Sequence, residues 1–172
     1  MQKINLKRGQ EAIGMSFSMI FSIILIAVFI AAAFVGIRAL LNWQKNVQVG
    51  LFIQGLQDEV DTAWAAPQSS TVYKGFLPTG IEEICIINWT SPVANSNDAE
   101  KNIMNEIKTT ATVISSQNFY IYPVKNNFKI KTQTIKHLDI RTHNPLCIKV
   151  IKNQASIKVN KNFDNPLVEL SE

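Results

Sequence analysis

The segment AIGMSFSMIFSIILIAVFIAAAFVGI, from Ala12 to Ile37, is the longest uncharged run in the chain. Its 26 residues carry no charge. As a helix they would extend about 39 Å, at ~1.5 Å rise per residue. The hydrocarbon core of a bilayer is about 30 Å thick, so the segment is long enough to cross it with some tilt. A buried helix of a soluble domain is equally apolar but rarely this long or this near the N-terminus. We therefore predict a transmembrane helix.

The rest of the chain has the size and composition of one modest domain outside the membrane. Of the 172 residues, 105 follow Pro67, which is near the usual size of a single domain. These 105 residues include 12 Lys and Arg and 9 Asp and Glu, and the lysines are scattered singly. This weak, dispersed charge argues against nucleic acid as a partner.

The charges around the apolar segment predict its orientation. Lys3, Lys7 and Arg8 precede it without any acidic residue. By the positive-inside rule, the N-terminus is expected in the cytoplasm and the C-terminal domain outside it. Arg38 and Lys45, on the far side, weaken this bias.

The N-terminus itself has three interpretations. A cleaved secretory signal would have a shorter apolar region, although Ala31 to Ala33 offer small residues for a cleavage site. An uncleaved signal anchor explains the length and the charges. Neither explains the sequence KRGQEA, Lys7 to Ala12, that directly precedes the apolar helix.

KRGQEA followed by a long apolar helix resembles the class III signal of archaeal type IV pilin-like proteins. The resemblance covers about 60 residues and implies that a prepilin peptidase-like enzyme cuts after Gly9 on the cytoplasmic side. Gln10 would then be the new N-terminus, and the apolar helix would stay in the mature protein. Pilins of the bacterial type carry a glutamate at the fifth mature position, which is Gly14 here.

Small residues form a stripe along the predicted membrane helix. Gly14, Ser18 and Ser22 recur every four residues and therefore lie on one face. Such stripes let helix backbones approach closely, which predicts a helix bundle or homo-oligomer. The resemblance implies that other pilin-like subunits are partners as well. The alternative is that each serine bonds to the carbonyl one turn back and needs no partner helix.

An amphipathic pattern continues beyond the membrane surface. Apolar residues recur there at spacings of three and four, whereas Gly50, Gln54, Asp58 and Asp61 fall on the other side. The stripe consists of Val49, Phe52, Ile53, Leu56 and Val60, followed by Ala63 and Trp64. Because Pro67 ends the pattern, we predict one helix from about Glu11 to Ala65, whose second half docks on the head through these residues. An ordinary helical stalk or a short coiled coil is the alternative.

After Pro67 the signals are mostly those of β-strands. Strands are expected at 71–77 and 84–88, then a helix at 98–108 capped by Asn97 with Glu100 at the capping-box position. Two hairpins are expected next, one joining 118–125 to 128–134 around Asn126-Asn127 and one joining 146–151 to 155–159. Pro123 would place its strand at a sheet edge. The predicted fold class is α+β, a long N-terminal helix with a C-terminal antiparallel β-sheet or small sandwich as the head.

Two covalent features are expected on a domain outside the cytoplasm. Cys85 and Cys147 are the only cysteines and would form a disulfide there, the alternative being two buried thiols. Asn88-Trp89-Thr90 matches the N-glycosylation pattern at the end of a predicted strand.

The sequence shows no pattern of an enzyme. It contains no nucleophile elbow, phosphate-binding loop or dinucleotide fingerprint. His137 and His143, with Asp139 between them, have neither a metal-site spacing nor an evident third ligand. We therefore expect no catalytic residues, no cofactor and no metal.

These patterns divide the chain into a leader (1–9), a transmembrane helix (10–37), an amphipathic arm (38–66) and an extracytoplasmic head (67–172). The resemblance implies a single-pass membrane protein that serves as the structural subunit of a surface filament or pseudopilus. The alternative function is a signal-anchored binding module that does not polymerise.

Overall fold

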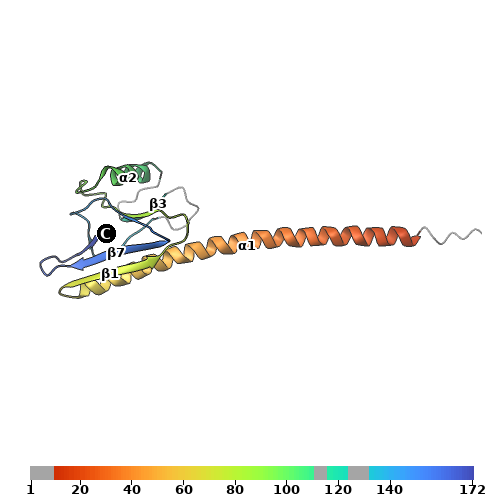
Figure 1. Ribbon diagram of the computed structural model, residues 1–172, viewed down its shortest axis with the longest axis horizontal. Coiled ribbons are helices and arrows are strands. Elements are labelled where there is room, and N and C mark those ends of the chain that lie inside the picture. Colours follow the sequence, from red (N-terminus) through yellow and green to blue (C-terminus); the bar gives the residue numbers. More distant parts are fainter. Residues whose placement is uncertain (1–9, 111–115, 124–131) are drawn as a thin grey trace, which may run out of the picture. The chain divides into compact units, whose positions relative to one another are not determined.

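The computed structural model describes residues 10–110, 116–123 and 132–172, and gives only the backbone of residues 10–17. The chain divides into two compact units, Met1–Trp43 and Gln44–Glu172. One element, helix α1 (Gln10–Ala65), belongs to both, since it contains 56 residues and runs past the boundary (Figure 1). The predicted helix from about Glu11 to Ala65 is therefore confirmed. It ends where Pro67, which has no amide hydrogen, follows two residues later.

The head contains two four-stranded sheets and a second helix. The first sheet has the order β1-β7-β8-β5 and the second the order β4-β3-β2-β6. The first consists of β1 (Ser69–Phe76), β7 (Gln154–Lys161), β8 (Val168–Ser171) and β5 (Leu138–Asp139). The second consists of β4 (Thr132–Gln133), β3 (Phe119–Tyr122), β2 (Glu83–Ile86) and β6 (Leu146–Lys149). Helix α2 spans Asp98–Thr110. The predicted α+β class is confirmed, with one parallel pair, β5 and β8, among otherwise antiparallel strands.

Two apolar clusters hold the head together on the two faces of the second sheet. The larger cluster joins the last five turns of α1 to the inner faces of both sheets, through residues such as Leu56, Ile84 and Ile157. The smaller cluster lies between the second sheet and α2, around Cys85, Ile107 and Cys147. The second sheet is thus covered on both sides, whereas the outer face of β1 and β7 is exposed.

The predicted hairpin between 146–151 and 155–159 is right at its turn, where Ile151 and Gln154 exchange backbone hydrogen bonds, and wrong in the pairing of its strands. Lys152 and Asn153, with φ of 52° and 62°, do turn the chain, but β6 pairs with β2 and β7 pairs with β1. The physical reason is burial on both faces of β6, where Leu146 and Cys147 are both buried and therefore require a covered sheet. β7 alternates instead between buried and exposed residues, as a strand with one solvated face does.

The predicted edge position of the strand before Pro123 is also wrong, because β3 lies between β4 and β2. Pro123 comes after the last residue of β3, so the sheet needs no amide hydrogen from it. β3 and β4 do pair antiparallel, as the first predicted hairpin requires. Its turn at Asn126-Asn127 lies outside the described residues. The remaining predicted elements are close to β1, β2 and α2.

Candidate functional site

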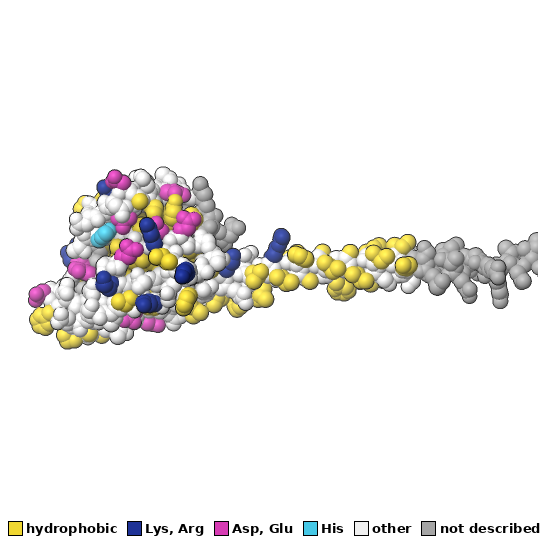
Figure 2. Space-filling model, in the orientation of Figure 1, with side chains coloured by type: hydrophobic (Ala, Val, Ile, Leu, Met, Phe, Trp, Pro, Cys, Tyr) yellow, Lys and Arg dark blue, Asp and Glu magenta, His cyan; other side chains and the backbone are white. Residues whose placement is uncertain are grey.

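The first part of α1 presents an apolar surface. Within the described residues, α1 is the one helix long and apolar enough to cross a membrane. Its large side chains from Met19 to Trp43 are exposed, and Figure 2 shows them as a nearly continuous apolar coat. Exposed apolar surface of this extent is stable in lipid and unstable in water. The surface therefore has the character of a membrane anchor.

The predicted packing stripe on this helix is only partly described. Of Gly14 only the helical backbone is described. The Ser22 hydroxyl donates to the Ser18 carbonyl at 2.9 Å, one turn back in the same helix. This bond satisfies the hydroxyl without a partner helix, as the alternative interpretation requires. Helix packing through the stripe stays a prediction.

The predicted cleavage residues are placed only in part. Gly9 lies outside the described residues, and α1 begins at Gln10, of which only the backbone is described. Processing at this bond stays a prediction as well.

The predicted arm (38–66) carries the docking residues into the core of the head with its part from Val49 to Ala65, to which the name arm is restricted from here on. All five predicted docking residues are buried there, namely Val49, Phe52, Ile53, Leu56 and Val60. Phe52 contacts two aromatic rings of the head edge-on or tilted, Tyr73 at 5.5 Å and Phe119 at 6.3 Å between ring centroids. The Tyr73 hydroxyl also donates to the Phe52 carbonyl at 2.9 Å. The arm is therefore an integral part of the head.

Two glycines make this close contact sterically feasible. A Cβ at Gly75 would lie 2.4 Å from a ring carbon of Phe52, and one at Gly55 would lie 2.6 Å from the Tyr73 hydroxyl oxygen. Both distances are far inside van der Waals contact. Each glycine thus leaves the space that a neighbouring aromatic ring fills.

We expect Gly75→Ala to destabilise the head by about 2 kcal/mol, because a methyl group there overpacks the Phe52 ring. The midpoint of urea unfolding in detergent measures this change. Lys74→Ala, at the next position in the same strand with an exposed side chain, is the matched control and should shift the midpoint little. A Gly75→Ala midpoint equal to that of the control would contradict the steric argument.

The arm makes a second contact with the head, through Asp61 and Trp64, that the sequence did not predict. The Trp64 and His137 rings are stacked, with 3.9 Å between their centroids and 5° between their planes. His137 Nδ1 lies 2.9 Å from Asp61 Oδ1, and Gln57 donates to the same oxygen at 2.7 Å. Asp61 was expected on the solvent side and Trp64 in the buried stripe, yet Trp64 is 45% exposed. The stacked rings and the hydrogen bonds of Asp61 hold the arm against His137, the residue before β5.

Cys85 and Cys147 form a disulfide, with an S–S distance of 2.03 Å. They lie opposite each other in β2 and β6 and are buried beneath α2. Glu83 lies nearby, but both sulfur atoms are used in the bond and supply no thiolate for a metal ion. The bond joins residues 62 positions apart and links β2 to the edge strand β6 of the second sheet.

The predicted capping box of α2 is present and reaches this sheet. Glu100 donates its backbone amide to Asn97 Oδ1 at 2.9 Å, and its own carboxylate accepts from the Asn97 amide at 2.8 Å. The carboxylate, only 6% exposed, also accepts from the Cys147 amide and lies 3.2 Å from His143 Nε2. His143 and His137 therefore have different partners and share no site.

The side chain of the predicted glycosylation residue, Asn88, is engaged locally. Its Oδ1 accepts from the amide and hydroxyl of Thr90, and its Nδ2 donates to Ser91 Oγ at 2.9 Å. Asn144 holds the backbone on both sides of Asn88. Nδ2 is the atom that a glycan would modify, so the bond to Ser91 must open first. Glycosylation stays a prediction.

A polar cluster near β5 and β8 stabilises the exposed edge of the first sheet. Arg141 donates twice to Asp139, at 2.9 and 2.7 Å, and Asn165 donates to the same carboxylate. The hydrogen bonds from Arg141 hold the pKa of Asp139 well below its usual value, against the opposing effect of burial.

This cluster predicts a stability change in acid. Because the pKa of Asp139 is lower in the folded head than in the unfolded chain, the carboxylate stabilises the fold fully above its ordinary pKa of 3.8. That contribution is lost as the pH falls below about 4. Asp139→Asn should lower the free energy of unfolding by about 2 kcal/mol at pH 7. It should also reduce the loss of stability between pH 4 and lower pH. Urea midpoints at pH 7, 4 and 2.5 measure both effects, and an unchanged loss of stability at low pH in the variant would contradict the assignment.

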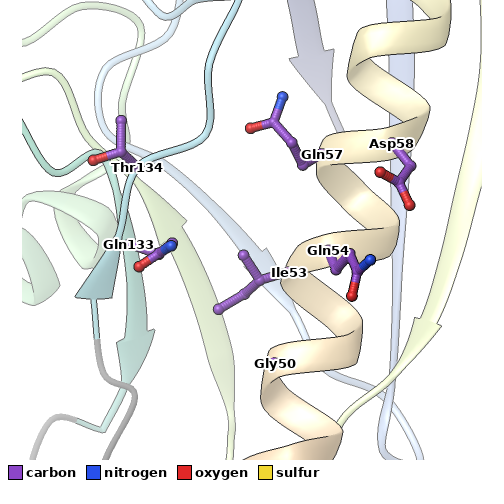
Figure 3. A pocket seen from close by; sticks show the side chains of 7 residues that line it. All are labelled: Gly50, Ile53, Gln54, Gln57, Asp58, Gln133 and Thr134. Atoms are coloured by element: carbon purple, nitrogen blue, oxygen red, sulfur yellow. The ribbon is translucent and has the colours of Figure 1, made fainter.

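A small hollow lies where the arm meets β4, and Figure 3 shows its lining. Its volume is about 300 Å³, at the lower end of the range for small-molecule sites. Ile53 points towards β4, and the remaining lining is mostly amides, hydroxyl and one carboxylate: Gly50, Gln54, Gln57, Asp58, Gln133 and Thr134. The hollow suits a small polar group and lacks a paired acid and base.

Comparisons with known proteins were made for the whole chain. No family model, curated protein or solved structure matches it.

Proposed function

We propose that this protein is a type IV pilin-like subunit, cleaved after Gly9 and assembled into a surface filament or pseudopilus through the first part of α1. The observation that carries the proposal is the change of character along this one helix. Its first part is apolar and exposed, whereas its arm is buried in a β-rich head. A subunit held in lipid by one end of a helix, with a folded head on the other end, has the form that the resemblance to pilins implies.

In this proposal the N-terminus is cytoplasmic before cleavage and the head is extracytoplasmic. The basic residues before the helix and the disulfide of the head both support that orientation, since disulfides persist in oxidising compartments. The partners are a membrane, a prepilin peptidase-like enzyme, and further copies of this chain or other pilin-like subunits. No catalytic role is proposed.

The test is the intact mass and N-terminal sequence of protein extracted from membranes of a host that has a prepilin peptidase. The expected chain begins at Gln10, and Gly9→Val should abolish cleavage because the peptidase would no longer find its glycine. Gly14→Val, inside the apolar helix, is the matched control and should be cleaved normally. A chain that still begins at Met1, or that begins just after Ala33, would overturn the proposal.

A second candidate function is an anchored binding module that does not polymerise. Two observations favour it, the internally bonded Ser18 and Ser22 pair and the polar hollow beside β4. In this case the hollow would take a small polar ligand, and the helix would serve only as an anchor. A monomeric protein in gentle detergent extracts would favour this candidate.

A further inference from the structure

A second hollow lies at the end of the head where the chain arrives from the apolar segment. Lys45, in the first turn of α1 within the unit Gln44–Glu172, lines it together with Phe76 at the end of β1 and Lys152 in the turn before β7. The Leu77 amide donates to the Asn153 carbonyl at 2.8 Å, which fixes the end of β1 to this turn. The side chains around the hollow are therefore held on one surface of the head.

This surface combines cations with exposed apolar side chains. Phe76, which is 63% exposed, lines the hollow with Lys45 and Lys152, and Ile151, which is 68% exposed, directly precedes Lys152 in the chain. None of the described residues that line the hollow is acidic. Lysines whose stems lie over apolar surface, beside an exposed aromatic ring, are typical of surfaces that contact lipid headgroups. We name this set, Lys45, Phe76, Ile151 and Lys152, the basal surface.

The position of the basal surface along the chain identifies its partner. Trp43 precedes Lys45 by two residues, about 3 Å of helix rise, and is 64% exposed. Exposed tryptophans at the end of an apolar helix gather at the level of the lipid headgroups. Lys45 thus lies two residues beyond the tryptophan that we expect at the headgroup layer, and Phe76 and Lys152 line the same hollow as Lys45.

We propose that the basal surface docks on anionic lipid headgroups of the membrane that anchors the chain. Lys45 and Lys152 contact lipid phosphates, and Phe76 and Ile151 enter the boundary between headgroups and acyl chains. Each lysine near an anionic surface favours the docked state about fivefold, so the two together favour it roughly 30-fold. The inference rests on the membrane anchor and is independent of cleavage and of filament assembly.

The test uses the full chain in nanodiscs of phosphatidylglycerol or phosphatidylcholine that contain a nickel-chelating lipid. A nitroxide is attached at Thr79→Cys, an exposed position on the hollow, and its relaxation by nickel reports how close the basal surface lies to the headgroups. A label at Asn102→Cys on α2 is the reference, because Figure 1 shows α2 on the other side of the head from β1. Lys45→Gln with Lys152→Gln removes both cations, and Lys101→Gln with Lys108→Gln on α2 is the charge-matched control.

In phosphatidylglycerol we expect strong relaxation at residue 79 and weak relaxation at residue 102. The ratio of docked to undocked protein should fall about 30-fold in the Lys45 and Lys152 double variant, and the control pair should leave it unchanged. Equal relaxation at both labels would overturn the proposal, since the head would then not dock. Equal relaxation at residue 79 in both lipids and in both double variants would also overturn it, since the tether alone would explain the proximity.

Discussion

Removing the disulfide should produce one of the two largest losses of stability in this protein. The bond joins residues 62 positions apart, so its loss frees a long loop in the unfolded chain. In the chain-entropy model this costs about 4 kcal/mol. For a head of this size, we expect the Cys85→Ala and Cys147→Ala double variant to unfold about 15 °C lower than wild type, as followed by near-ultraviolet circular dichroism in detergent.

Wild-type protein treated with a thiol reductant under the same conditions is the control for this prediction. It should unfold near the temperature of the double variant, because both lack the same covalent bond. A double variant that unfolds within about 2 °C of oxidised wild type would show that the bond between β2 and β6 constrains the unfolded chain little.

The other large loss is expected for Phe52→Ala in the arm. Phe52 is buried, lies at the centre of the contact with Tyr73 and Phe119, and fills the space left by Gly75. Truncating a buried phenylalanine leaves a cavity and typically costs about 3 to 5 kcal/mol. We expect a matching fall in the urea midpoint of the full chain in detergent, with Tyr73 more accessible to solvent.

Leu51→Ala is the matched control, because Leu51 neighbours Phe52 in the same helix but is 63% exposed. This substitution should change the free energy of unfolding by less than about 0.5 kcal/mol. Equal effects of the two substitutions would mean that the arm is held by its helical continuity and not by burial in the head.

Local patterns in the sequence predicted the helices well, for a physical reason. The three-and-four spacing from Val49 to Val60 reports which face of a helix is buried, and this depends only on near neighbours along the chain. Asn97 and Glu100 likewise form a capping box whose partners are three residues apart. Such signals lie within one turn of helix and are readable without the fold.

Contacts between distant parts of the chain were not predictable in the same way. Pairing of β6 with β2 instead of β7 depends on both faces of β6 being covered, which local alternation reveals only in part. Strand β8 escaped prediction because its four residues give a short pattern.

Two polar contacts of the head also escaped prediction. His137 stacks on Trp64 from 73 positions away, and no spacing rule connects them. Lys161, at the end of β7, is buried and donates to the carbonyls of Asn162 and Asn165. The alternation of β7 places Lys161 on the same face as Ala155, Ile157 and Val159, and this position was a signal that the lysine is buried. Its hydrogen-bond partners lie in the following loop and could not be read from that pattern.

The polymeric state of the mature chain is the decisive test of the proposed pilin-like function. Surface material sheared from cells that express the protein with its processing enzyme should contain filaments, visible by electron microscopy and labelled by an antibody against the head. We predict that these filaments contain the chain beginning at Gln10 and are lost in the Gly9→Val variant. A correctly cleaved chain that stays entirely in the membrane as a monomer would contradict it.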